Sequence, residues 1–363
     1  IRRQRQMCIR DRNYPLLKSI LKMKKSLMTL GVLALFVLMA YGQEKKFALY
    51  SVAFYNMENL FDTIHDEGKN DYEYLPNGTN QWNTMKYKAK LKNMSEILSM
   101  LSTDKLPMGP AIIGVSEIEN YRVLEDILKQ PALADRGYQY VHYEGADQRG
   151  VDCAFFYNPK LFELTNSKLV PYVYINDTVH KTRGFLIASG NIAGEKMHFI
   201  VNHWPSRAAT SPARERAGEQ VRAIKDSLLK EDSAAKIVIM GDMNDDPMDK
   251  SMAVALGAKR KPADVGPTDL YNPWWDTLKK GYGTLMYKGK WNLFDQIVFT
   301  GNLLGTDRST LKFYKHEIFC RDFMFQKEGK YKGYPKRTQA GGVWLNGYSD
   351  HLPTIIYLIK EVK

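Results

Sequence analysis

The stretch at residues 236–247, which reads KIVIMGDMNDDP, constrains the fold more than any other part of the chain. It begins with an apolar, β-branched run, which predicts a buried strand. The run ends at Gly241, where a polar segment begins. Asp242 and Asn244 lie two residues apart, so a backbone that stays extended would place both side chains on one face. This spacing predicts a base or metal ligand beside a hydrogen-bonding amide at a strand end.

The end of the same stretch has a pattern that is typical of a helix start. Asp246 would be the N-cap and Pro247 the first helical residue. This interpretation accounts for neither Asp242 nor Asn244, and it leaves Asp245 without a role. The partners of Asp242 and Asn244 must therefore be sought elsewhere in the chain.

The chain is long enough and apolar enough to form a large folded domain. It has 363 residues, of which 44% are hydrophobic, so a sizeable core is expected and disorder is excluded. Strands and helices are interleaved, which predicts a single α/β domain at residues 43–363, with surface loops at 319–347. The expected strands are residues 47–55, 112–117, 151–157, 183–190, 196–203, 236–240, 294–300 and 352–359, and the expected helices are 86–101, 121–129 and 217–228.

The net charge gives little support to a polyanionic partner. The formal charge is +12, but residues 1–22 contribute +6 and Lys24 and Lys25 a further +2, which leaves +4 for the rest. A charge of this size does not by itself indicate binding to nucleic acid or to a membrane.

Residues 23–42 have the composition of a bacterial signal peptide. Lys24 and Lys25 precede an apolar run that ends in the small-x-small sequence Ala40-Tyr41-Gly42. We therefore expect residues 1–22 to be a non-native upstream extension and the mature protein to be periplasmic or secreted, with no membrane span after cleavage. The alternative is an uncleaved anchor, but the uncharged run is shorter than the ~20 apolar residues that span a membrane.

The cysteines indicate neither a disulfide framework nor a metal site. Cys8 lies in the upstream extension, and no spacing typical of a metal site is present. Cys153 and Cys320 could form one disulfide in an oxidising compartment. Because Cys153 lies in the apolar run VDCAFFY, we favour two buried thiols.

Polar residues recur at or beside the ends of the expected strands. Each one alone has an ordinary explanation, since buried carboxylates are often bound by backbone amides and single histidines are often structural. Together, convergent carboxylates repel one another unless a cation offsets their charge, and oxygen ligands without cysteine favour Mg²⁺ or Mn²⁺. The residues concerned are Asn56, Glu117, His203, Asp242, Asn244, Asp295, Asp350 and His351.

A series of motifs resembles the endonuclease/exonuclease/phosphatase superfamily, which includes DNase I, abasic-site endonucleases, sphingomyelinases and inositol polyphosphate 5-phosphatases. The motifs are, in order, FYNMENLF, GVSEIEN, NHWPSR, GDMND, FDQIVF and YSDH, and they run from about Tyr50 to Leu352. Single motifs of this kind are weak, whereas the complete ordered series is specific. The resemblance implies a DNase I-like four-layer α/β sandwich, in which two packed mixed or antiparallel sheets are flanked by helices.

The resemblance also implies a metal site. Glu117 would be the principal ligand, helped by Asn56 and Asp350, and the cation would bind phosphate oxygens. Many relatives have Gln before this Glu, whereas this chain has Ser116, so Glu119 is a rival ligand.

The implied catalytic residues surround this metal site. Asp242 would orient and deprotonate the attacking water or share in binding a second cation, and Asn244 would donate to a phosphate oxygen. His351, paired with Asp295, would stabilise the transition state, and His203 would act near the phosphate or the leaving group.

Three residues are candidates for binding the phosphate or the rest of the substrate. Arg183 and Arg207 could bind phosphate through two parallel hydrogen bonds, although a solvated arginine is the plain alternative. Trp204 could stack on a base or a ring, although local packing is the commoner role of such aromatic residues.

The leading interpretation is an exported, monomeric, metal-dependent phosphoesterase whose first expected substrate is nucleic acid, as for a nuclease or other phosphodiesterase. The alternative in the same class is a phosphatase or phospholipase acting on lipid, inositol or sugar phosphates. A catalytically inactive binding module at the cell surface is a different class, and it is disfavoured because the implied central residues are present.

Overall fold

The computed structural model describes residues 19, 22–26, 28, 45–175 and 179–362. Residues 48–361 form one compact unit. Most of the predicted extension and signal peptide therefore lies outside the described residues. Among the residues that are described, no helix is both long and apolar enough to cross a membrane.

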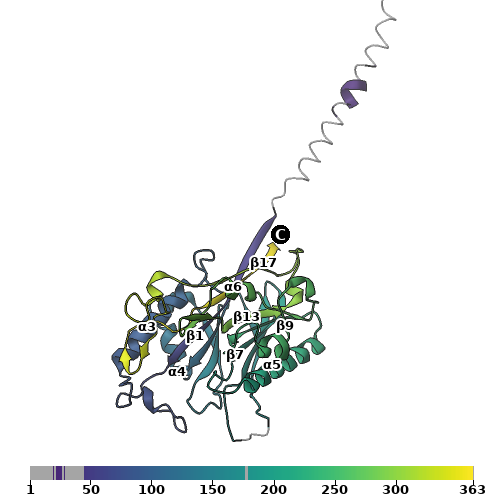
Figure 1. Ribbon diagram of the computed structural model, residues 1–363. Coiled ribbons are helices and arrows are strands. Elements are labelled where there is room, and N and C mark those ends of the chain that lie inside the picture. Colours follow the sequence, from purple (N-terminus) through teal and green to yellow (C-terminus); the bar gives the residue numbers. More distant parts are fainter. Residues whose placement is uncertain (1–18, 20–21, 27, 29–44, 176–178, 363) are drawn as a thin grey trace, which may run out of the picture. The chain divides into compact units, whose positions relative to one another are not determined.

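Two large sheets form the centre of the compact unit (Figure 1). The first has six strands in the order β14-β17-β1-β2-β4-β3, and the second has seven in the order β5-β6-β7-β8-β13-β10-β9. The first sheet consists of β14 (Lys312–Ile318), β17 (Thr354–Val362), β1 (Lys46–Leu60), β2 (Ile112–Ile118), β4 (Asp152–Tyr157) and β3 (Gln139–His142). The second consists of β5 (Glu163–Val170), β6 (Phe185–Ile192), β7 (Glu195–His203), β8 (Lys236–Asp242), β13 (Asp295–Thr300), β10 (Leu270–Tyr271) and β9 (Ala258–Lys259).

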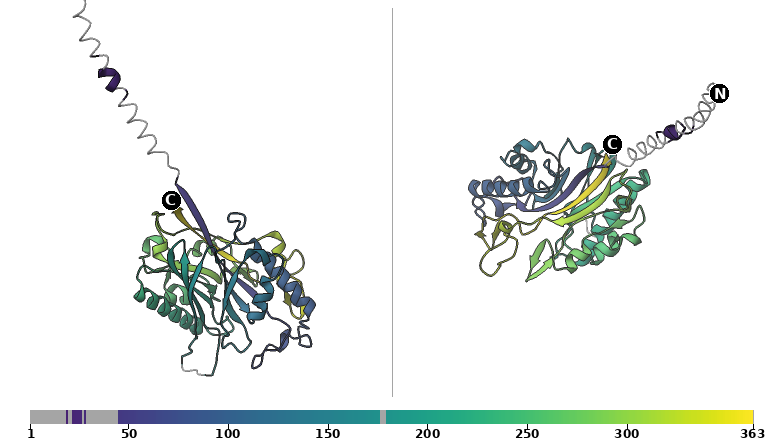
Figure 2. Two further views of the ribbon diagram at one scale, coloured as in Figure 1. Left: turned by 180° about the vertical axis from the view of Figure 1, so that it is seen from behind. Right: turned by 90° about the horizontal axis from the view of Figure 1, so that it is seen from above.

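Helices cover the outer face of each sheet, as the view from above in Figure 2 shows. Helices α3 (Thr84–Met100) and α4 (Tyr121–Leu128) pack on the first sheet. Helix α5 (Ser211–Glu231) and the π-helix η3 (Ser251–Leu256) pack on the second. The layers are therefore helix, sheet, sheet and helix.

Smaller elements occupy the connections. They are α6 (Trp275–Lys279), the hairpins β11 (Leu285–Tyr287) with β12 (Lys290–Asn292) and β15 (Gln339–Ala340) with β16 (Val343–Trp344), and the 3-10 helices η1 (Tyr72–Tyr74), η2 (Ala134–Arg136), η4 (Pro262–Asp264), η5 (Gly301–Leu303) and η6 (Asp322–Met324).

The central strands β1, β2 and β4 of the first sheet have buried side chains on both faces because both faces are covered. In β1, Val52 and Phe54 pack between the sheets, whereas Ala53 and Tyr55 pack under α3 and α4. This alternation follows from the two-residue period of a strand. The sheets approach closely at Gly114, where an added Cβ would lie 2.6 Å from Met240 Sδ.

Strand pairing brings the predicted polar residues together. Strands β7 and β8 are parallel, with His203 opposite Asp242, and the antiparallel strand β13 places Asp295 opposite Asp242 on its other side. In the first sheet, the parallel pair β1 and β2 places Asn56 opposite Ser116. The carboxyl ends of two parallel pairs, one from each sheet, therefore supply the candidate site.

The strand prediction was wrong at the end of β1. We expected the strand to end at Asn56, but it continues to Leu60 after a register shift, and Leu60 pairs with Ile118. The residues between Asn56 and Leu60 form a bulge in β1. A bulge interrupts the alternating pattern of a strand, so this part of the sequence predicts a loop.

The predicted helix start at Asp246 and Pro247 was also wrong. Pro247 lies in a turn, and the helical segment η3 begins only at Ser251, after Lys250. The Asp246 carboxylate instead accepts a hydrogen bond from the Leu293 backbone N–H at 2.7 Å, which is a contact with a distant part of the chain.

The prediction of two buried thiols holds for one cysteine. Cys153 is buried and Cys320 is exposed, and both are free. Cys320 lies in the connection that follows β14, whereas Cys153 lies in β4 and packs between the two sheets.

Candidate active site

The centre of the candidate site is the carboxylate of Asp242, at the end of β8. Its Oδ2 atom accepts a hydrogen bond from Asn56 Nδ2 at 3.0 Å, and the same nitrogen donates to Glu117 Oε1 at 3.1 Å. Its Oδ1 atom accepts from the Asn244 backbone N–H at 2.9 Å. Strand ends from both sheets thus meet at one point. We name as the strand-end cluster the side chains of Asn56, Glu117, His203, Asp242, Asp295 and His351.

In this arrangement Asn56 is a hydrogen-bond donor through its amide nitrogen, and its role as a metal ligand stays a prediction. Its Oδ1 atom accepts the Glu58 backbone N–H at 2.9 Å, so its amide nitrogen faces the two carboxylates. An N–H group cannot ligate a cation. In this arrangement Asn56 holds Glu117 and Asp242 side by side.

Unusual backbone conformations aim the side chains at the site. Glu117, Asn59 and Asn244 have φ angles of 59°, 50° and 52°, which are rare for residues other than glycine. Such conformations cost about 1–3 kcal/mol each and persist where the surroundings enforce them. Glu117 lies in a register irregularity of β2, and its Oε2 atom accepts the Asn59 backbone N–H at 2.9 Å. The strained backbone at Glu117 therefore directs its side chain towards the site.

His351 and Asp295 form a buried hydrogen-bonded pair. His351 Nδ1 lies 2.7 Å from Asp295 Oδ2, and its Nε2 atom lies 3.8 Å from Asp242 Oδ2. Although burial acts to lower it, Asp295 and Asp242 raise the pKa of His351 well above its usual value. His351 is therefore an imidazolium, and Asp295 directs its Nε2 atom towards Asp242.

The second buried histidine, His203, differs from His351 in that its pKa is lowered. His203 Nε2 lies 3.6 Å from Glu117 Oε1 and 3.7 Å from Asp242 Oδ2, and its Nδ1 atom has no hydrogen-bond partner. Burial, with Arg183 and Arg149 nearby, lowers its pKa well below the usual value. His203 is therefore neutral, and its ring offers an acceptor or ligand nitrogen.

The donor set of the strand-end cluster fits a hard divalent cation. Glu117 Oε1, His203 Nε2 and Asp242 Oδ2 lie within 4.8 Å of one another. Burial raises the pKa of Asp242, and the neighbouring Asp295 adds to this effect. Asp295 Oδ1 is buried without a hydrogen-bond partner. Buried carboxylates that repel one another and include an unpaired oxygen are stabilised by a cation such as Mg²⁺ or Mn²⁺.

Asp350 lies beside this donor set and is paired with an arginine, and its role as a ligand beside Glu117 stays a prediction. Its Oδ2 atom accepts a hydrogen bond from Arg337 Nη2 at 2.7 Å, and its Oδ1 atom lies 3.9 Å from His351 Nε2. Among the described residues, Asp350 belongs to none of the groups of three or more potential ligand residues whose atoms all lie within 4.8 Å of one another. The arginine neutralises it instead.

Glu119, the rival of Glu117, lies in another environment. Its Oε2 atom accepts the Asp62 backbone N–H at 2.7 Å. Burial, with Asp62 nearby, raises its pKa to about 9, so this carboxyl is neutral at pH 7. Glu117 is the member of the pair that faces Asp242.

Each of the three predicted substrate contacts has a partner or a packing position within the protein, and substrate binding by these residues stays a prediction. Arg183 is buried and donates to Asp147 Oδ2 at 2.8 Å. Arg207 donates to Asp249 Oδ2 at 2.9 Å. Trp204 is only 1% exposed and packs in the core under α5. Lone arginines and tryptophans do not reveal such partners in a sequence.

Asn244 lies beside the cluster, as predicted, with one amide N–H engaged. Its Nδ2 atom donates to the Trp204 backbone oxygen at 3.0 Å. The amide has a second N–H, so one donor can still serve a phosphate oxygen.

Sequence analysis missed two residues that support the site. Ser349 Oγ donates to the Asn56 backbone oxygen at 2.8 Å and accepts the His351 backbone N–H at 3.1 Å. A serine two residues before an essential histidine is a known local turn pattern and could have indicated this role. Arg337 binds Asp350 and Glu58, but it lies in an aperiodic stretch that gives no such signal.

Comparisons with known proteins agree with this geometry. Residues 51–360 match the family described as Endonuclease/Exonuclease/phosphatase family. A search of curated proteins found no match to the sequence.

Solved structures of similar fold include two from Bacteroides thetaiotaomicron. One is an endonuclease/exonuclease/phosphatase family protein, with 14% identity, TM-score 0.54, and coverage of 88% of this chain and 98% of that chain. The other is a mannosyl-6-phosphatase, with 14% identity, TM-score 0.52, and coverage of 85% and 99%. D. rerio TDP2 complexed with single strand DNA product has 15% identity, TM-score 0.50, and coverage of 86% and 99%. At these identities the likeness concerns the fold, and it confirms the predicted DNase I-like four-layer sandwich.

Proposed function

Because this chain belongs to the endonuclease/exonuclease/phosphatase family, we propose that it is an exported phosphoesterase whose strand-end cluster cleaves a P–O bond by in-line attack of water. Enzymes of this family are metal-dependent hydrolases of phosphate esters, and this chain is one of them. The proposal covers four points, which are the roles of individual residues, the identity of the cation, the substrate and export.

The observation that carries the proposal is the close approach of two buried groups, a carboxylate and an imidazole, at the ends of the strands. Asp242 Oδ2 lies 3.8 Å from His351 Nε2. Asp242 has a raised pKa and accepts a proton from the attacking water, while His351 is an imidazolium that donates to a phosphate oxygen. Asp295 keeps the imidazolium charged and oriented throughout.

Two further residues act on the phosphate. Asn244 donates its remaining N–H to a phosphate oxygen. His203, which is neutral, lies on the side of Glu117 and hydrogen-bonds the phosphate or the leaving group. Glu117 would be the principal ligand of Mg²⁺ or Mn²⁺, which when bound neutralises charge on the phosphate oxygens.

Nucleic acid was the first substrate class that the sequence suggested. Arg183, Arg207 and Trp204 give it no support, since each contacts the protein instead. A panel of single- and double-stranded DNA, RNA, sphingomyelin, inositol phosphates and sugar phosphates separates the nuclease from the phosphatase or phospholipase alternative.

The proposal of export rests on the composition of residues 23–42. Mass spectrometry of the exported protein is expected to find an N-terminus near Gln43. A product that retains the apolar residues 27–39 contradicts cleavage.

Chelation tests the hydrolytic function itself. EDTA is expected to abolish hydrolysis of bis(p-nitrophenyl) phosphate and p-nitrophenyl phosphate, and Mg²⁺ or Mn²⁺ to restore it. Activity that is indifferent to chelation contradicts the metal site. Absence of hydrolysis with every divalent cation favours an inactive binding module.

A further inference from the structure

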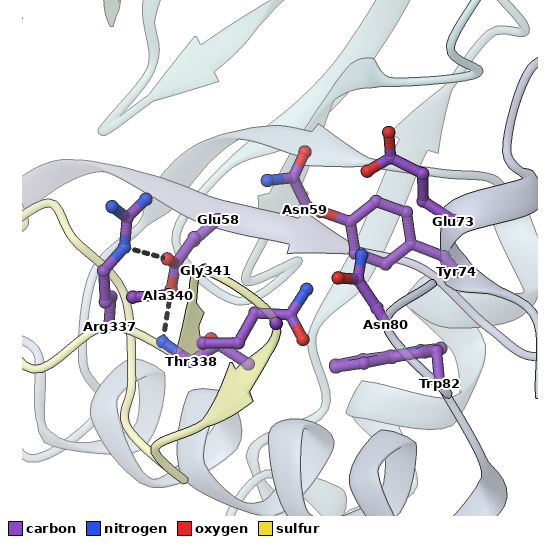
Figure 3. Close-up of a pocket in the computed structure, with 12 residues that line it drawn as sticks. Glu58, Asn59, Glu73, Tyr74, Asn80, Trp82, Arg337, Thr338, Ala340 and Gly341 are labelled. Atoms are coloured by element: carbon purple, nitrogen blue, oxygen red, sulfur yellow. Dashed lines mark hydrogen bonds and ion pairs between the residues drawn. The ribbon is translucent and has the colours of Figure 1, made fainter. Parts of the chain in front are cut away.

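A polar pocket lies next to the strand-end cluster and has no role in the proposed chemistry (Figure 3). It has a volume of about 180 Å³ and lies between the end of β1, the loop that contains η1, and the hairpin β15–β16. We name it the hairpin pocket, and the lining residues used below are Asn59, Glu73, Tyr74, Asn80, Arg337 and Gln339.

The hairpin pocket is connected to the catalytic centre through two of its residues. Asn59 donates its backbone N–H to Glu117 Oε2 at 2.9 Å. Arg337 donates to Asp350 Oδ2 at 2.7 Å, and Asp350 precedes His351 in the chain. A substituent of a phosphate bound at the strand-end cluster would therefore reach this pocket directly.

Several polar groups of the hairpin pocket are unused by the protein. The side-chain amides of Asn59, Asn80 and Gln339, and the hydroxyl of Tyr74, form no hydrogen bond with any residue that the structure describes. In Figure 3, Asn80 lies below Asn59 and Tyr74, and Gln339 is a further residue of the lining. Amide and hydroxyl groups both donate and accept hydrogen bonds, so together they suit a ligand that does the same.

The charge of the hairpin pocket disfavours an anionic ligand. Its carboxylates are Glu73 and Glu58, and its cation is Arg337. The Arg337 guanidinium is already bound, through Nε to Glu58 at 2.9 Å and through Nη2 to Asp350. Grooves that follow a nucleic-acid backbone are positively charged. A neutral ligand therefore fits better than a chain of phosphates.

The size of the hairpin pocket limits the ligand to a small group. Its volume of about 180 Å³ is below the ~300–1,000 Å³ of sites that enclose drug-sized molecules. The turn of the hairpin is Gly341–Gly342, where an added Cβ at either residue would meet nothing within 4 Å. The wall formed by this turn thus carries no side chain, which leaves room for a single ring.

We infer that the hairpin pocket binds a neutral, hydroxyl-rich ring, and that this protein hydrolyses phosphate monoesters of such polyols, which are sugars or inositol. The inference rests on the proposed phosphoesterase function. Water adds its oxygen to phosphorus as the P–O bond to the polyol breaks. One proton of the water goes to the departing polyol oxygen by way of the enzyme, and the products are inorganic phosphate and the free polyol.

The test compares kcat/KM for polyol phosphates with kcat/KM for a substrate that lacks a polyol. Glucose 6-phosphate, myo-inositol 1-phosphate and the dinucleotide thymidylyl-thymidine are assayed beside p-nitrophenyl phosphate, with Mg²⁺ and with Mn²⁺. The wild type is expected to prefer one of the polyol phosphates to p-nitrophenyl phosphate, and the preferred one distinguishes a sugar from an inositol ring. A preference for the dinucleotide overturns the inference.

The variant Asn80→Ala/Gln339→Ala removes two of the unused amides. The ratio of kcat/KM for the preferred polyol phosphate to that for p-nitrophenyl phosphate is expected to fall about tenfold, because hydrogen bonds to the ring are lost. Both assays use the same preparation, so a partly unfolded sample does not alter the ratio. The control Val343→Ala lies on the other strand of the hairpin, is exposed, and is expected to keep the wild-type ratio.

Two results are decisive against the inference and differ in scope. A wild type that cleaves p-nitrophenyl phosphate but neither polyol phosphate refutes the role of the hairpin pocket and leaves the phosphoesterase intact, as does an unchanged ratio in the double variant. A wild type that cleaves no phosphate ester with any divalent cation refutes the proposed function and this inference together.

Discussion

Two groups of acidic residues meet at the end of β8, one containing Asp242 and the other beginning at Asp245, and their charges are offset in different ways. The strand-end cluster contains Asp242, whose near neighbours Glu117 and Asp295 are also carboxylates. The second group, which we name the turn cluster, follows directly in the chain. It consists of Asp245, Asp246, Asp249, Arg207 and Arg214.

Every carboxylate of the turn cluster has a guanidinium within ion-pair distance. Arg214 Nε lies 2.8 Å from Asp245 Oδ2, and Arg207 Nη2 lies 2.9 Å from Asp249 Oδ2 and 3.3 Å from Asp246 Oδ2. Backbone and hydroxyl donors complete the set, such as Ser251 Oγ to Asp245 at 2.7 Å. The carboxylates of this group are thus paired within the protein, and the group has the character of a structural brace between β8 and η3.

The strand-end cluster does not satisfy itself in this way. Its one fixed cation is the His351 imidazolium, and Asp295 Oδ1 has no partner. The comparison teaches that charge alone does not mark a site. An acidic residue indicates chemistry when the fold brings it to other acids without arginine or lysine partners, because the missing charge must then come from a ligand.

The largest expected difference between the two clusters is in turnover. Asp242→Ala is expected to lower kcat by about 10²–10⁴, because it removes the group that accepts the proton from water. Asp249→Ala, in the turn cluster, is the matched control and is expected to leave kcat near that of the wild type. Steady-state kinetics with p-nitrophenyl phosphate measures both. Near-normal turnover by Asp242→Ala shows that the base has been misassigned.

Stability is expected to respond in the opposite sense. Arg214→Ala leaves the buried Asp245 without its ion pair, so the free energy of unfolding is expected to fall by about 3–5 kcal/mol. Urea denaturation measures the loss. The molecules that remain folded are expected to have wild-type kcat. A lower kcat per folded molecule contradicts the claim that the turn cluster is structural and not catalytic.

A pH profile sharpens the comparison within the strand-end cluster. Asp295→Asn removes a carboxylate that raises the pKa of His351, so the imidazolium is expected to lose its proton at lower pH. Activity that needs this proton is present below the pKa and lost above it. The alkaline limb of the kcat profile is therefore expected to move to lower pH than in the wild type. An unmoved limb contradicts the role of the pair.

The smallest effect is expected at the surface of the turn cluster. Arg207 is 43% exposed, so water screens its ion pairs. Arg207→Ala is expected to reduce the free energy of unfolding by no more than about 1 kcal/mol, measured by urea denaturation as for Arg214→Ala. A loss as large as that of Arg214→Ala removes the difference between buried and exposed pairs.

The layers of the fold could be predicted because local patterns decide them. The β-branched runs predict that β8 and β2 are buried strands. The helical spacing of apolar residues in α3 predicts which face of that helix packs on the sheet. Local patterns failed where a distant partner decides the structure. The Leu293 N–H captures Asp246, and the pairing of Leu60 with Ile118 extends β1 beyond Asn56.

The sequence could predict which residues meet at the candidate site, but it could not predict which other side chains pair with them. His203, Asp242 and Asp295 lie in one row because β7, β8 and β13 are neighbours in the second sheet. Nothing in the sequence reveals that Asp147 binds Arg183 or that Arg337 binds Asp350. The hairpin pocket was missed for the same reason, since its residues come from separate loops without a periodic pattern.

The central claim is that the strand-end cluster binds a divalent cation that the turn cluster does not need. Thermal unfolding with increasing Mn²⁺ or Mg²⁺, after removal of metals with EDTA, tests it most directly. The wild type and Arg207→Ala are expected to gain stability with metal, by about 2.7 kcal/mol at 100 times the dissociation constant. Glu117→Gln and Asp242→Ala are expected to gain little or none. An equal gain in all four proteins, or no gain in the wild type, contradicts the account.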